Sequence, residues 1–259
     1  MLFGSLLDLA FAVLVLSLMV GAVFLTRWKL TPQLREDAES IAAVSAAIVA
    51  VYGLILGLTL AAAWERYQRA EETMNNELNG MFALSHMAYN WRGEGGEDLQ
   101  QSIVDYGRTV YANELTGEDP NRVKASEGRL ALEKVVQQLA NITAGPGGQL
   151  AVTDPAWTVV VAIDNARGSR LMLSRQALPT QFWVVLYVVA ALSLVSLVLI
   201  HPKSRALHVA ISIGAAILIV VAIILLRDLD APLEGASTID FESYNTAVDI
   251  LQKSLSGQS

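Results

Sequence analysis

Acidic side chains that could bind a cation gather late in the sequence, at Asp228, Asp230 and Glu234. Carboxylate oxygens are the ligands that Ca²⁺ prefers, so these three acids are candidate calcium ligands. Their spacing does not follow that of an EF-hand loop, and a solvated, capped helix end is the alternative interpretation. We expect no other cofactor or metal.

Basic side chains form a second group. Arg167, Arg170 and Arg175 precede a long apolar segment. A cluster of positive charge attracts anions, so the three arginines could form an anion vestibule. They could instead contact lipid headgroups or pair with acids such as Glu71 and Glu72. Both interpretations remain open from the sequence.

Small residues form a stripe in an early apolar segment, at spacings of four, three, four and four. The stripe consists of Ala46, Ala50, Gly53, Gly57 and Ala61. Residues at these spacings lie on one helix face. Such a face lets another helix pack closely, or it lines a pore where small side chains leave room for ions. The stripe leads to Glu65 and Arg66, which could ring a pore mouth or simply belong to an aromatic interfacial anchor with Trp64 and Tyr67.

Several classes of function are excluded or made improbable by composition. The chain has no cysteine and only three histidines, so disulfides, thiolate sites and His-rich metal sites are not expected. Its net charge is −7, which disfavours a nucleic-acid partner. The sequence contains no P-loop, H-E-x-x-H, G-x-S-x-G or G-x-G-x-x-G motif. We therefore predict that the protein is not an enzyme.

The elements that must position these residues are membrane helices. A span needs about 20 apolar residues. Four charge-poor segments meet this requirement, at about 2–26, 41–64, 180–200 and 207–226. The first includes Asp8, and a signal peptide is its alternative, although no basic residue precedes its apolar stretch.

These segments predict an all-α integral membrane protein with four transmembrane helices arranged as two hairpins. The hairpins cover residues 1–64 and 179–227, a helical extramembrane domain covers 65–178, and a C-terminal tail covers 228–259. Helical periodicity in 97–114 and 123–142, and a helix from 155 to 175, account for most of the domain. Lys and Arg near the spans number five on one side and six on the other, so the positive-inside rule leaves the orientation open.

Short motifs in this order resemble the bacterial bestrophin-like family of unknown function. They are VYGLILG at 51–57, WERY at 64–67, the arginines described above, Leu178-Pro179 before Trp183, and DAPLEG at 230–235. The resemblance extends over most of residues 41–241 and reaches, more distantly, the bestrophin anion channels.

The resemblance implies a homo-oligomeric, pentameric channel that conducts inorganic anions such as chloride, with the second span lining the pore. It also implies a bacterial plasma membrane as the location, lipid as the surroundings, and a cytoplasmic helical domain. A membrane-anchored scaffold, whose helical domain binds a partner protein, is the alternative function.

Overall fold

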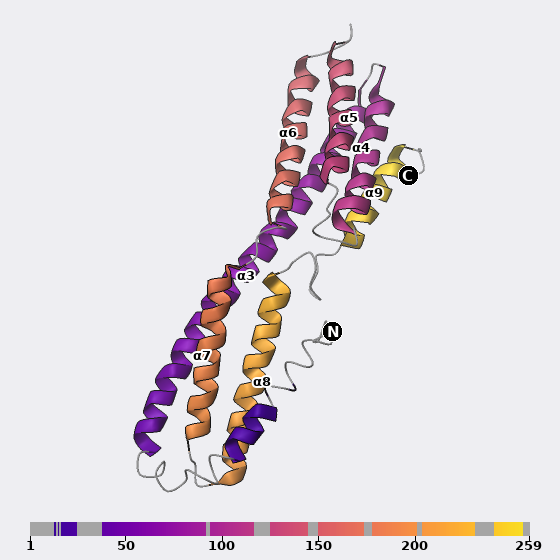
Figure 1. Ribbon diagram of the computed structural model, residues 1–259. Coiled ribbons are helices and arrows are strands. Elements are labelled where there is room, and N and C mark those ends of the chain that lie inside the picture. Colours follow the sequence, from indigo (N-terminus) through magenta and orange to yellow (C-terminus); the bar gives the residue numbers. More distant parts are fainter. Residues whose placement is uncertain are drawn as a thin grey trace. The chain divides into compact units, whose positions relative to one another are not determined.

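The computed structural model describes residues 13, 15 and 17–24, then 38–91, 94–116, 125–144, 150–173, 178–200, 204–230 and 241–255 (Figure 1). Every regular element in these ranges is helical, which confirms the all-α prediction. The elements are α3 Ala38–Tyr89, α4 Gly96–Val110, the π-helical turn η1 Tyr111–Leu115, α5 Ala125–Ala144, α6 Leu150–Leu173, α7 Thr180–Leu199, α8 Arg205–Asp230 and α9 Phe241–Leu255.

The longest element, α3, has 52 residues and contains no proline. At 1.5 Å per residue it is about 78 Å long, more than twice the thickness of a hydrocarbon core. The second predicted span, about 41–64, thus forms the first half of a helix that continues to Tyr89 in the helical unit. Gly80, the one glycine in its charged half, lies where α6 packs closely, since a Cβ there would be 2.6 Å from Cγ1 of Ile163.

The chain divides into two compact units. The membrane unit consists of Met1–Tyr67 and Ala177–Ser237, and the helical unit consists of Gln68–Gln176 and Thr238–Ser259. Among the described residues, three helices are long and apolar enough to cross a membrane, namely α3, α7 and α8. Most of the predicted first span, about 2–26, lies outside the described residues, although 17–24 are helical.

The core of the membrane unit brings α3, α7 and α8 together. Its buried residues are Tyr52 and Ala63 of α3, Leu186 and Ala190 of α7, and Ile219, Ile223, Leu226 and Leu229 of α8. The Ser45 hydroxyl of α3 donates a hydrogen bond to the Ser196 carbonyl of α7 at 3.0 Å. Burial of apolar side chains and this hydroxyl contact fix which face of α3 turns toward α7.

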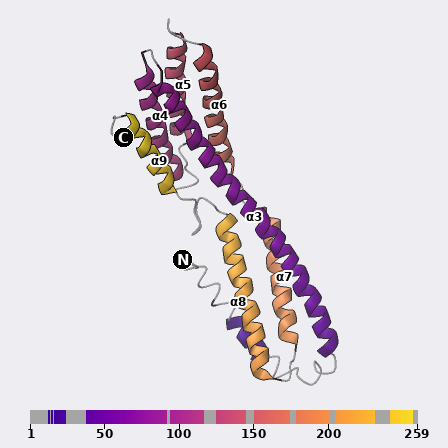
Figure 2. The ribbon, with the colours of Figure 1, turned by 180° about the vertical axis from the view of Figure 1, so that it is seen from behind.

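The helical unit packs α4 against α5 and α9, and α5 against α6. Figure 2 shows α9 alongside α4. Gly107 of α4 permits this approach, because a Cβ there would be 2.6 Å from Cε of Met81 and 2.8 Å from Cγ2 of Val248. The segment expected to be a C-terminal tail thus contains a helix whose Tyr244 and Val248 are fully buried.

Two local features differ from the sequence-based expectation. Helix α6 begins at Leu150, so Pro155 lies inside the helix rather than at its first position and removes one backbone hydrogen bond. The helix predicted over 97–114 changes at Tyr111 into the π-helical turn η1. The amide of Thr116 closes that turn by donating to the Tyr111 carbonyl at 2.9 Å.

Candidate functional site

The small-residue stripe of α3 is exposed along its whole length in the single chain. All five of its residues are exposed, and no described residue outside the same turn of helix lies within 4 Å of where a Cβ on Gly53 or Gly57 would be. Within the membrane unit, Tyr52, Thr59 and Ala63 are buried on the other side of the helix. The stripe occupies an arc of roughly 80° at 100° per residue. Its surface is therefore available to lipid or to another subunit.

Exposure also distinguishes α3 from the other candidate spans. Only 11% of the most apolar window of α3 is buried in the single chain, compared with 28% for α7 and 39% for α8. Surface that a membrane helix leaves uncovered in the single chain faces lipid, a second chain or an aqueous pore. Of the described spans, α3 has the most surface to offer to an oligomer.

The two predicted pore-mouth residues have different surroundings. Glu65 is exposed on α3, whereas Arg66 is half-buried and forms an ion pair with Asp230 at the end of α8. The neighbouring rings of Trp64 and Tyr67 stack with their centroids 5.6 Å apart. Trp and Tyr are the residues typical of the membrane interface.

Asp230 accepts hydrogen bonds from three directions. Besides Arg66, the Leu178 amide donates to Oδ1 at 2.8 Å and the Trp183 indole N–H donates to Oδ2 at 3.4 Å. We call Arg66, Leu178, Trp183 and Asp230 the Asp230 junction. It ties the end of α8 to α3 and to the start of α7.

The three candidate calcium ligands are not assembled around a common point in the described part of the chain. Asp230 is engaged in the junction, Asp228 lies two residues before it on α8, and Glu234 falls outside the described residues. No group of three His, Asp or Glu side chains in the described ranges has the arrangement of a metal site. At Asp230, the positive charge is supplied by the Arg66 guanidinium.

Four charged residues form a buried cluster in the helical unit. Glu77 of α3, Glu114 of η1, and Arg167 and Arg170 of α6 have side chains that are at most 7% exposed. Arg170 donates to Glu77 Oε2 and to Glu114 Oε2, each at 2.8 Å. Arg167 donates to Glu114 Oε1 at 2.7 Å. We call these four residues the charge cluster; its two positive and two negative charges balance.

The charge cluster bears on the predicted anion vestibule. The structure places Arg167 and Arg170 in the interior, where carboxylates neutralise both guanidinium groups. Their partners are Glu77 and Glu114, while Glu71 and Glu72 are exposed. Arg175 falls outside the described residues. Arg167 and Arg170 are three residues apart, a spacing that places both side chains on the same face of α6.

Glu114 lies in the π-helical turn η1, and its carboxylate reaches the cluster from there. Its carboxylate also lies against the backbone of α5 at Gly128, where a Cβ would collide with Glu114 Oε1. Helical register with Ile103, Gly107 and Val110 places position 114 on the buried face, but apolar periodicity gives no signal for an inward-pointing acid.

Replacement of Gly128 by alanine is expected to destabilise the helical unit by about 1–3 kcal/mol, as overpacking does in other cores. Alanine gains up to about 1 kcal/mol of helix propensity, and displacement of the Glu114 carboxylate must outweigh that gain. The midpoint of thermal unfolding in detergent, followed by circular dichroism, measures the effect. Gly168→Ala is the matched control, since nothing lies within 4 Å of its Cβ position and no loss is expected.

Two buried tyrosines border the charge cluster. The Tyr106 hydroxyl donates to Glu77 Oε1 at 2.6 Å, and the Tyr244 hydroxyl donates to Met81 Sδ at 3.6 Å. Burial raises the pKa of Tyr106 well above its ordinary value of 10.0, and the Glu77 charge raises it further. Burial and Glu77 act in the same direction on the pKa of Tyr244.

These raised pKa values predict an alkaline loss of stability. Both tyrosines titrate at a higher pH in the folded than in the unfolded state, so their stabilising effect is complete below pH 10.0 and declines as pH rises toward the folded-state pKa. Unfolding midpoints measured on either side of pH 10.0 should fall as pH rises. The Tyr106→Phe variant should show a shallower fall, and an unchanged slope would contradict the assignment.

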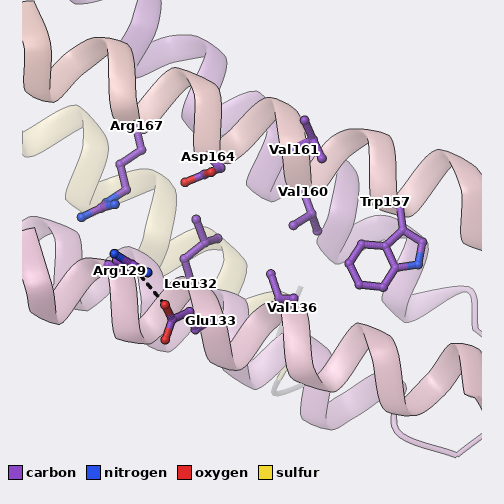
Figure 3. Close-up of a pocket in the computed structure, with 9 residues that line it drawn as sticks. All are labelled: Arg129, Leu132, Glu133, Val136, Trp157, Val160, Val161, Asp164 and Arg167. Carbon is purple, nitrogen blue, oxygen red and sulfur yellow. Dashed lines mark hydrogen bonds and ion pairs between the residues drawn. The ribbon is translucent and has the colours of Figure 1, made fainter.

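A groove of about 490 Å³ lies between α5 and α6. Figure 3 shows Val136 and Val160 facing each other across it, with the Trp157 ring at one end and Arg129 and Arg167 toward the other. Leu132 and Val160 are buried at its base, and Arg129 pairs with Glu133 at 2.9 Å on the exposed side. The volume is in the range of ligand-binding clefts.

Comparisons with known proteins agree with this architecture. The model of the Bestrophin-like domain matches residues 9–244. A crystal structure of a bacterial bestrophin homologue from Klebsiella pneumoniae superposes with a TM-score of 0.77 at 12% identity, covering 96% of this chain and 98% of the homologue.

A point variant of the Klebsiella pneumoniae homologue gives a TM-score of 0.79 at 12% identity, covering 95% and 99% of the two chains. A variant described only as a membrane protein gives 0.79 at 11% identity, covering 98% and 100%. At such identity the superpositions show the shared fold. No curated protein matches the sequence.

Proposed function

Because the chain belongs to the bestrophin-like family, we propose that it is a homo-oligomeric channel in which α3 lines a pore for inorganic anions such as chloride. Characterised members of the family are channels and not enzymes, and their homologues are oligomeric integral membrane proteins. The observation that supports a pore along α3 is the exposed small-residue stripe from Ala46 to Ala61.

The stripe has the properties that a pore wall made from identical helices requires. A ring of subunits brings the same face of each α3 toward a common axis, and glycine and alanine leave the space between them open. Five subunits are the proposed number, by analogy with the bestrophin channels. Exposed Glu65 lies directly after the stripe and would contribute one carboxylate per subunit at the end of the pore.

The proposed location is the bacterial plasma membrane, with the helical unit in the cytoplasm. A reporter enzyme that is active only in the cytoplasm, fused after Ser259, tests the orientation. The C-terminal helix α9 belongs to the helical unit, so the reporter reports on that whole unit.

Conduction itself is tested with the purified protein in planar lipid bilayers under a KCl gradient. The expected result is a current whose reversal potential lies near the equilibrium potential of Cl⁻. A reversal potential near that of K⁺ would contradict anion selectivity, and absence of current in every salt would contradict the channel. Repeating the recording with Ca²⁺ and with a chelator tests whether Asp228, Asp230 or Glu234 confers calcium dependence.

A scaffold function is the second candidate, and the groove between α5 and α6 favours it. Its base is apolar, Trp157 lines one end, and charged residues lie on its exposed side. If the groove holds a partner protein, a protein should co-purify from mild detergent, and Trp157→Ala should abolish that co-purification. If the protein is a scaffold, the purified protein should show no current in planar bilayers. Co-purification and current measured on the same preparation therefore distinguish the two functions.

A further inference from the structure

The membrane unit contains an apolar groove that the proposed channel function does not use. Its volume is about 370 Å³, and nine residues line it. Four belong to the described part of the first predicted span and five belong to the second half of α7, and all nine are apolar. The volume falls in the range of ligand sites, which is roughly 300–1,000 Å³.

The groove has a closed base and open rims. Met19 of the first span and Val198 of α7 line it and are buried in the same apolar cluster, so the two segments meet along the base. Leu18 and Val195 also line the groove, and they are 64% and 58% exposed. The space above the base is therefore open to the surroundings of the membrane unit, which are lipid or a second chain.

Among the described residues, no polar side chain lines the groove. This half of α7 carries two serines, and both are buried elsewhere with their hydroxyls bonded to the backbone of α7 itself. Ser193 donates to the Val189 carbonyl and Ser196 donates to the Ser193 carbonyl, each at 2.8 Å. A ligand with hydrogen-bonding groups would find no partners on these walls, so the groove favours a hydrocarbon.

The position of the groove along α7 matches one leaflet of a bilayer. Helix α7 extends from Thr180 to Leu199, and its lining residues begin at Ala191 and end at Leu199. The eight residues from Ala191 to Leu199 rise about 12 Å. Half of a hydrocarbon core is about 15 Å thick. The groove thus begins at one end of the span and stops near its middle, which is the path of an acyl chain in a single leaflet.

The width of the groove also favours an acyl chain over a helix of a second copy. A helix with its side chains is about 10–12 Å across, too wide to enter a space between two segments that touch at its base. Each wall contributes an alanine, Ala22 on the first span and Ala191 on α7, where a longer side chain would fill the space. A narrow apolar slot of this kind suits a single file of methylene groups, which gains dispersion contacts with both walls.

We propose that this groove is a binding site for one acyl chain of a phospholipid from the surrounding bilayer. The bound chain contacts the first span and α7 together, and so completes the packing between them. The site goes beyond the proposed channel function and does not depend on conduction. Recognition is of the hydrocarbon, because the groove offers nothing that would bind a headgroup.

Lipid retention tests the site. The purified protein is stripped of lipid in detergent, incubated with dioleoylphosphatidylglycerol and washed, and the phospholipid that remains per chain is measured by mass spectrometry. The unmodified protein should retain a stoichiometric amount. Ala191→Trp and Ala22→Trp, which fill the groove from opposite walls, should each retain severalfold less.

Leu192→Trp is the matched control for these variants. It adds the same bulk at the next residue of α7, which is 53% exposed, points about 100° away and does not line the groove. Its retention should equal that of the unmodified protein. If a tryptophan in the groove prevents folding, Ala191→Leu fills less of the space and should still lower retention.

Thermal unfolding of the stripped proteins tests the packing role. Adding the same phospholipid should raise the unfolding midpoint of the unmodified protein and of Leu192→Trp, because a ligand stabilises the state that binds it. The rise should be smaller in Ala191→Trp and Ala22→Trp, whose groove is already occupied by an indole.

Three results would overturn the proposal. The first is no stoichiometric retention by the unmodified protein, and the second is equal retention by the filled variants and Leu192→Trp, since the lipid would then be held by no particular groove. The third is unchanged retention in Ala191→Trp and Ala22→Trp together with loss of the oligomer, measured by light scattering, which would assign the groove to a second copy of the chain.

Discussion

Replacing Glu114 with glutamine is expected to destabilise the helical unit by about 3–5 kcal/mol, and replacing Arg167 with glutamine should cost a similar amount. Both side chains are almost fully buried and are bonded to each other at 2.7 Å. Removing either charge leaves the cluster unbalanced by one elementary charge in a place that water does not reach. An uncompensated buried charge is among the largest single-residue penalties known in proteins.

The double variant should cost clearly less than the sum of the two single variants. With both charges removed, Glu77 and Arg170 remain as a balanced pair. We expect a coupling energy of about 1–3 kcal/mol from the double-mutant cycle. Guanidinium titration in detergent micelles, followed by circular dichroism, gives the four unfolding free energies.

The chain supplies its own control for this cycle. Arg129 and Glu133 form an ion pair at 2.9 Å on the surface of α5, with side chains 75% and 55% exposed. Its coupling energy should be at most about 0.5 kcal/mol, as for exposed helical pairs. Equal coupling energies for the exposed and buried pairs would mean that the charge cluster contributes no more than a surface contact.

Substitution of Gly57 by tryptophan is expected to abolish conduction. No described residue outside its own turn of helix lies within 4 Å of where a Cβ on Gly57 would be, so a side chain can project from this position. In a ring of subunits, one indole per subunit would fill a lumen bordered by glycine and alanine. The measurement is the current in planar bilayers, with the oligomeric state of the same sample determined by size-exclusion chromatography and light scattering.

Two variants decide whether a loss of current reflects a filled pore. Leu58→Trp adds similar bulk at the next residue, which is 65% exposed and points about 100° away, and it should conduct. Gly57→Ala should also conduct, because alanine already occurs at three positions of the stripe. If Leu58→Trp blocks as completely as Gly57→Trp, bulk anywhere on α3 disturbs the assembly and the stripe does not mark the pore.

Much of the fold could be predicted because helices leave local patterns in a sequence. The charge-free windows at 41–64, 180–200 and 207–226 correspond to apolar parts of α3, α7 and α8. No proline occurs from 65 to 91, and α3 accordingly runs on without a break from the apolar window to Tyr89. The residues at which helices begin were harder to predict. Proline is common in the first turn of a helix, so the sequence predicted that α6 starts at 155, whereas it starts at Leu150.

The candidate site was less accessible to sequence reasoning, since its contacts join residues far apart in the chain. The bond between Arg170 and Glu77 links positions 93 residues apart, and neither position has a distinctive local motif. Glu114 is an acid on the buried face of its helix, and apolar periodicity gives no signal for such a residue. The stripe from Ala46 to Ala61 was visible because a helix face is a local property, and the structure places that face at the surface of the chain.

The Asp230 junction sets an order of events during biosynthesis. Arg66 is made 164 residues before Asp230, the carboxylate that pairs with it. At about 5–20 residues per second, ribosomes need roughly 8–33 s to cover that distance. Throughout that interval α3 has been made but its α8 partner has not, so the bond between Arg66 and Asp230 cannot form. The bond can close only after α8 has been made, so a closed bond marks the arrival of α8 beside α3.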